Sequence, residues 1–123
     1  MTLDYLRLLG DYNYWANRRL LDSMTGMPLE KLLGDMGYSW GSPLGMLVHS
    51  LAVEWLWRQR WQGTSPTRLM SPDEFADLAA VRARWEQDEA EMRAFLAGLD
   101  EADLARPVNY VTMTGQPNTQ QLG

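Results

Sequence analysis

Apolar residues recur at helical spacing along the first part of the chain and predict one long helix over residues 3–24. Thr2 is a suitable N-cap, and Gly26 followed by Pro28 is a typical helix end. The positions that share the predicted apolar face are Leu6, Leu9, Asn13, Ala16 and Leu20.

Asn13 lies within this apolar face, and Asn17 follows one turn later. A buried amide needs hydrogen-bond partners, so the pair could orient another group. The alternative is that each asparagine caps a neighbouring turn or lies at the edge of the face, and we favour that interpretation.

A second helix is predicted from Ser42-Pro43 to about Trp61, with Gly63 closing it. This helix is apolar around most of its circumference, so it has to be covered on more than one side. Two neighbouring helices do not suffice for that, and either a further helix or a second copy of the chain is expected to cover it.

A third helix is predicted from the capping box at residues 71–74 to about Leu96. Apolar residues at heptad spacing form a bundle seam on it, and Asp88 occupies the remaining slot. Asp88 could ligate a metal or act as a base, but we favour an ion pair with Arg84 at the edge of the seam. The seam consists of Leu78, Val81, Trp85, Met92, Phe95 and Leu99.

The pattern changes after Asp100. Residues 107–114 are rich in β-branched and aromatic side chains and precede a Gly115–Pro117 turn, which predicts a small hairpin or extended strap near residues 107–118. Asn118 or Thr119 could then cap the start of another helix.

Composition favours one domain over residues 1–123, because 46% of the residues are hydrophobic and the chain is long enough to bury a core. The net charge of −5 argues against nucleic-acid binding, which needs a basic face. No segment resembles a signal peptide or a membrane span, and the chain has no cysteine, so we expect a cytoplasmic protein. Six tryptophans and eight methionines suit a large core or a core plus a homodimer interface.

His49 is the only histidine and lies in the apolar second helix, with a predicted orientation toward the core. A buried imidazole needs a polar partner or a metal, because leaving it unpaired costs roughly 1–3 kcal/mol. The chain offers no second histidine and no cysteine that could complete a metal site with it.

Four segments, taken in order, resemble the DinB-like (damage-inducible) family over essentially the whole chain. They are residues 12–21 (YNYWANRRLL), residues 42–49 (SPLGMLVH), residues 54–58 (EWLWR) with Gly63, and residues 107–110 (PVNY) with Gly115.

The resemblance implies an all-α four-helix bundle, here an up-and-down bundle with three long helices and a fourth that is missing or truncated. It also implies a divalent metal (zinc, nickel or iron) held by three histidines, one from the second helix and two from a His-x-x-x-His pair on the fourth. His49 matches the first of these ligands, and the other two have no counterpart in the chain.

Two functions of different classes follow. The first is a metal-dependent enzyme acting on a small molecule, of the thiol-dependent transferase, isomerase or hydrolase type, with His49 as its first metal ligand. The second is a non-catalytic helical module that self-associates through an exposed apolar face. A role of this chain on nucleic acid in a damage response has only the family name in its favour.

Overall fold

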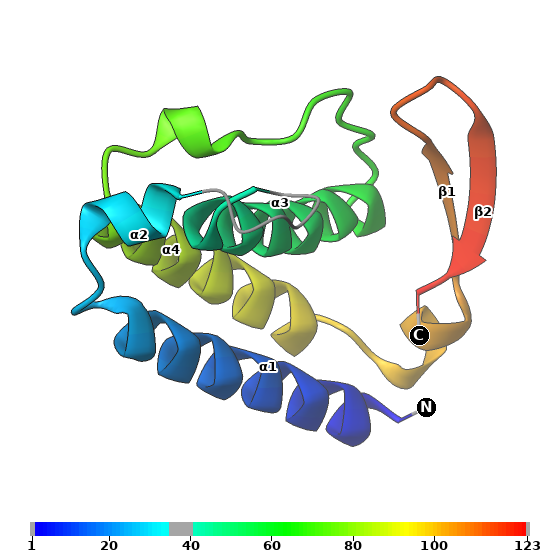
Figure 1. The fold of residues 1–123 in the computed structure, drawn as a ribbon. Helices are drawn as coiled ribbons and strands as arrows, with labels where there is room; N and C mark the ends of the chain where they lie inside the picture. Colours follow the sequence, from blue (N-terminus) through cyan, green and yellow to red (C-terminus); the bar gives the residue numbers. More distant parts are fainter. Residues whose placement is uncertain (1, 35–40, 123) are drawn as a thin grey trace.

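Three long helices form the body of the protein, and a two-stranded hairpin closes one end of it (Figure 1). The computed structural model describes residues 2–34 and 41–122. The long helices are α1 (Leu3–Met24), α3 (Pro43–Trp61) and α4 (Leu78–Ala97), with a short helix α2 (Leu29–Leu33) between the first two. Residues 62–77 return along α3, so α3 and α4 run in the same direction and α1 runs opposite to both (Figure 1).

Helix starts follow the predicted capping chemistry at α1 and α3. The Thr2 hydroxyl accepts a hydrogen bond from the Tyr5 amide at 3.1 Å, and the Ser42 hydroxyl accepts one from the Gly45 amide at 2.9 Å. Both helices have the predicted boundaries, and none of the described helices is long and apolar enough to cross a membrane.

The predicted start of the third helix is wrong by six residues. The capping box at Ser71 forms, but it closes only the 3₁₀ turn η1 (Pro72–Glu74). Phe75 then adopts an extended conformation and packs against the core, and Asp77 caps α4 instead, accepting from the Ala80 amide at 2.9 Å. The extended backbone that lets Phe75 pack, partly buried, against the core thus interrupts the helix that the capping signal favours.

The predicted helix beginning at Asn118 or Thr119 is also not observed. These residues belong to β2 (Pro117–Gln121), which pairs antiparallel with β1 (Pro107–Val111). Val108 and Tyr110 of β1 are buried, so β1 is held in place on the bundle and offers its backbone groups to a partner strand. A second 3₁₀ turn, η2 (Glu101–Ala105), connects α4 to the hairpin.

Two apolar clusters fill the interior, one at each end of the bundle. One joins α1, the end of α4 and the hairpin, and the other joins the end of α1, α2, the start of α3 and the start of α4. Most of the predicted seam is confirmed: Val81, Trp85 and Met92 of α4 and Leu99 just after it are buried, while Leu78 and Phe95 are partly buried.

The predicted apolar face of α1 is only partly correct. Leu9 and Leu20 are 40% and 48% exposed. The residues of α1 that are buried instead are Leu3, Tyr14, Leu21 and Met24. Because α1 carries apolar residues on two sides, its periodicity alone does not decide which side faces the core.

Candidate functional site

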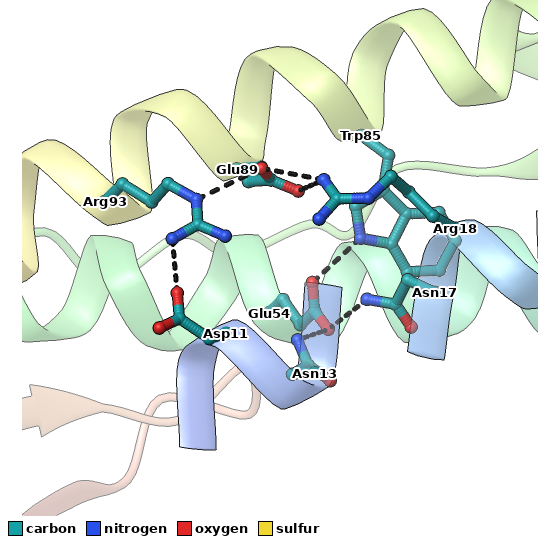
Figure 2. Close-up of polar contacts among 8 residues, drawn as sticks. All are labelled: Asp11, Asn13, Asn17, Arg18, Glu54, Trp85, Glu89 and Arg93. Carbon is teal, nitrogen blue, oxygen red and sulfur yellow. Dashed lines mark hydrogen bonds and ion pairs between the residues drawn. The ribbon is translucent and has the colours of Figure 1, made fainter. Parts of the chain in front are cut away.

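A layer of polar side chains crosses the middle of the bundle between the two apolar clusters. Its centre is Glu54 of α3, whose carboxylate accepts three hydrogen bonds (Figure 2). Asn13 and Asn17 of α1 each donate from Nδ2 to Oε1, at 2.7 and 3.2 Å, and Trp85 of α4 donates from Nε1 to Oε2 at 3.0 Å. Glu54 therefore joins all three long helices.

The spacing of the two asparagines explains how α1 reaches this carboxylate. Residues four apart lie on the same side of a helix, so Asn13 and Asn17 approach one oxygen of Glu54 from successive turns. Asn13 is exposed and Asn17 is partly buried, in keeping with a position at the edge of the face, and both asparagines also bind another group, the carboxylate of Glu54.

Burial raises the pKa of Glu54 above its ordinary value, and the three hydrogen bonds act against that rise. All three partners donate, and both carboxylate oxygens accept, so this arrangement suits the ionised form. Glu54 thus places a negative charge in the bundle with neutral donors around it.

A buried ion pair lies beside this centre. Asp88 of α4 is 1% exposed and accepts from Arg58 of α3 at 2.5 Å, and Arg58 also reaches Glu91 at 2.8 Å. The predicted pair of Asp88 with Arg84 at the edge of the seam is wrong. The seam position turns Asp88 toward α3, where Arg58, four residues after Glu54, meets it.

An alternating chain of charges links α1 to α4 at the surface near Glu54. Arg18 binds Glu89, Glu89 binds Arg93, and Arg93 binds Asp11, with distances of 2.6–3.1 Å (Figure 2). These arginines are therefore committed to carboxylates other than Glu54.

A pocket of about 480 Å³ opens between α1, α3 and the end of the hairpin. Its lining is mostly apolar, and Glu54, Asn13, Gln120 and Gln121 supply polar groups to it. The apolar side chains of the lining are Leu6, Leu9, Val53, Trp57, Trp61, Met92, Leu96 and Leu122. The sequence contains no recognisable motif for this pocket, because its residues come from four separate segments, in α1, α3, α4 and the end of the hairpin.

His49 lies in α3 and is partly buried. Val53, Trp57 and Trp61 follow it at intervals of four residues and line the pocket. His49 therefore lies on the same side of α3 as these three residues, nearer the start of the helix. It is not among the described lining residues themselves.

A comparison with protein families identifies this architecture. The model of the DinB superfamily matches residues 13–121, most of the chain. The chain belongs to the DinB superfamily. No curated protein and no solved structure gives a significant match. DinB-superfamily membership is generally associated with metal-dependent enzymes, and this raises the question of whether the described residues could hold a metal.

The metal-ligating types of side chain among the described residues do not form such a site. Over residues 2–34 and 41–122, no group of three or more His, Cys, Asp or Glu side chains is arranged to hold a metal ion. The carboxylates of the polar layer are already engaged, Glu54 with three neutral donors and Asp88 with Arg58. These residues, as arranged, offer no metal site through which a catalytic step could proceed.

Proposed function

We propose that this DinB-superfamily chain works as a self-associating helical module, in which α1 packs against α1 of a second copy. The observation that carries the proposal is a second apolar stripe on α1, on the side away from the core. Its central members are 50–64% exposed. Single apolar residues on a surface are common, but a contiguous exposed group of this kind is typical of an interaction surface. The central members are Tyr5, Leu8, Tyr12 and Trp15.

The spacing of the stripe supports a helical contact surface. Successive members are three, four and three residues apart, which keeps them on one side of the helix. Aromatic residues are enriched in protein interfaces, where they bury large area at low entropic cost. The rings of Tyr12 and Trp15 already lie together, with centroids 5.7 Å apart.

Charge supports a second copy as the occupant. The whole chain is acidic, but α1 carries three aspartates and three arginines. Asp4 lies at one end of the stripe and Arg19 at the other, and neither forms an ion pair with the residues that the structure describes. Antiparallel packing about a two-fold axis near Tyr12 brings Asp4 of each copy toward Arg19 of the other.

Two kinds of variant test this arrangement by sedimentation velocity. Tyr12→Glu places a charge in the stripe and is expected to give monomers, while the matched control Gln87→Glu, on exposed α4 surface, leaves the dimer intact. Asp4→Arg and Arg19→Glu are each expected to weaken the dimer, and the double variant is expected to restore it. Unchanged association of Tyr12→Glu, or no recovery in the double variant, contradicts this geometry.

The second candidate function is a metal-dependent enzyme acting on a small molecule, of the transferase, isomerase or hydrolase type. Superfamily membership supports it, as does the place of His49 on the pocket side of α3. In this proposal His49 supplies one ligand to zinc, nickel or iron, and the remaining ligands come from outside the described residues.

Elemental analysis of the purified, dialysed protein tests the metal proposal. It predicts near-stoichiometric metal in the wild type and loss of that metal in His49→Ala, with Gln87→Ala as the control. Absence of metal from the wild type, or full occupancy in His49→Ala, contradicts it.

For either function, the acidic charge argues against nucleic acid as a partner, and we expect a cytoplasmic location from the absence of cysteine.

A further inference from the structure

The pocket between α1 and α3 has the properties of a site for a small organic molecule. A volume of about 480 Å³ lies within the range typical of ligand pockets. Such pockets combine apolar walls with a few polar groups that fix the orientation of the ligand. Here the apolar walls surround a single carboxylate, that of Glu54.

Glu54 lacks a cationic partner among the described residues. Its three hydrogen-bond donors are two amides and an indole, all neutral. Nearby arginines are engaged with other groups. On α3 itself, Arg58 pairs with Asp88 and Glu91, and Arg60 lies over the rings of Trp57 and Tyr110. On the neighbouring helices, Arg18 pairs with Glu89, and Arg93 pairs with Asp11 and Glu89. The negative charge at the pocket is therefore stabilised by dipoles alone.

The carboxylate keeps capacity for one more donor. Its two oxygens offer about four acceptor positions, and the protein donates to three of them. Asn13, which donates to Oε1, is itself exposed, so the approach to this oxygen from the pocket is open to solvent.

The aromatic walls suit the apolar body of a ligand. Trp57 and Trp61 line the same pocket, while the guanidinium of Arg60 lies over the Trp57 ring at 4.8 Å and Trp61 stacks on Phe95. These rings therefore supply apolar surface, and the carboxylate of Glu54 supplies the attraction for a cation. Apolar side chains from α1, such as Leu6 and Leu9, complete the wall opposite α3.

We propose that this pocket binds an amphiphilic primary amine, with its ammonium group on Glu54 and its apolar body against Trp57, Trp61 and the leucines of α1. The site lies on the side of α1 opposite Leu8 and Tyr12, so it does not depend on self-association. A carboxylate of the same size is excluded, because its charge has the same sign as that of Glu54.

Calorimetric titration with three molecules of similar size tests the proposal: phenethylamine, 2-phenylethanol and 3-phenylpropanoate. The amine is expected to bind at least roughly tenfold more tightly than the alcohol, because a charge-assisted hydrogen bond is stronger than a neutral one. The propanoate is expected not to bind. Equal affinity for amine and alcohol, or binding of none of the three, overturns the proposal.

Two variants locate the site. Glu54→Gln is expected to bind amine and alcohol equally, provided that circular dichroism shows a folded protein. Leu9→Trp fills the pocket from an exposed position and is expected to abolish binding, while Leu20→Trp, on the same helix but outside the lining, is expected to leave binding unchanged. Because Leu9 and Leu20 are both well exposed, this pair decides the location even if Glu54→Gln does not fold. Identical behaviour of the two tryptophan variants overturns the assignment.

Discussion

Glu54 shows at the scale of a residue how a polar group is kept inside an apolar bundle. A carboxylate removed from water loses hydration worth several kcal/mol unless hydrogen bonds replace it. Asn13, Asn17 and Trp85 supply these bonds from two other helices, so the same contacts that satisfy Glu54 also fix the relative positions of α1, α3 and α4.

Asp88 and Arg58 illustrate the opposite solution, a buried pair of opposite charges. Burial raises the pKa of Asp88, and the guanidinium of Arg58 acts against that rise. Because both side chains are at least 97% buried, neither charge can turn to water if its partner is lost.

Asp88→Asn is therefore expected to lower the free energy of unfolding by about 3 kcal/mol, because it leaves Arg58 buried with only Glu91 as an acidic partner. Urea denaturation measures this loss. Glu91→Gln serves as the control, since Glu91 is half exposed, and is expected to cost less than about 1 kcal/mol. Equal losses in the two variants would show that burial of Asp88 does not matter.

At the scale of elements, local signals in the sequence predicted most of the fold. Caps and apolar periodicity placed α1 and α3 at their observed boundaries, and the β-branched run predicted the hairpin. The errors occur where contacts distant in the sequence decide the outcome, at Phe75 before α4 and at β2, which pairs with β1.

The two capping signals before α4 make a matched test at this scale. Asp77→Ala removes the cap of the 20-residue helix α4 and is expected to cost about 1 kcal/mol of stability. Ser71→Ala removes the cap of the exposed three-residue turn η1 and is expected to cost no more than about 0.5 kcal/mol. Thermal denaturation measures the loss of stability in both variants. A larger loss for Ser71→Ala than for Asp77→Ala would contradict this assignment of the helix start.

The candidate site was less accessible to sequence reasoning than the fold. The place of Asn13 in the predicted apolar face allows the interpretation that it and Asn17 orient another group, but nothing in the sequence pairs them with Glu54, 41 and 37 residues away. Similarly, the seam position of Asp88 was predictable, whereas its partner Arg58 depends on how α3 and α4 pack. His49 as a metal ligand remains a prediction.

At the scale of the whole molecule, the distribution of charge and apolar surface favours association through α1. Bringing two acidic chains together costs electrostatic repulsion, which is smallest where the contacting element carries no net charge. α1 meets this condition with its three aspartates and three arginines, and it also carries the exposed aromatic stripe. The pocket and Glu54 remain accessible on its other side.

Sedimentation equilibrium of the wild-type chain tests this account most directly. If α1 packs against α1 of a second copy, the particle at micromolar concentration is expected to have twice the mass of the 14.1 kDa chain. It is expected to dissociate to single chains on dilution or when Tyr12 is replaced by Glu. A mass of one chain at every concentration up to the millimolar range would contradict it, because the stripe on α1 would then be exposed without a second copy to cover it.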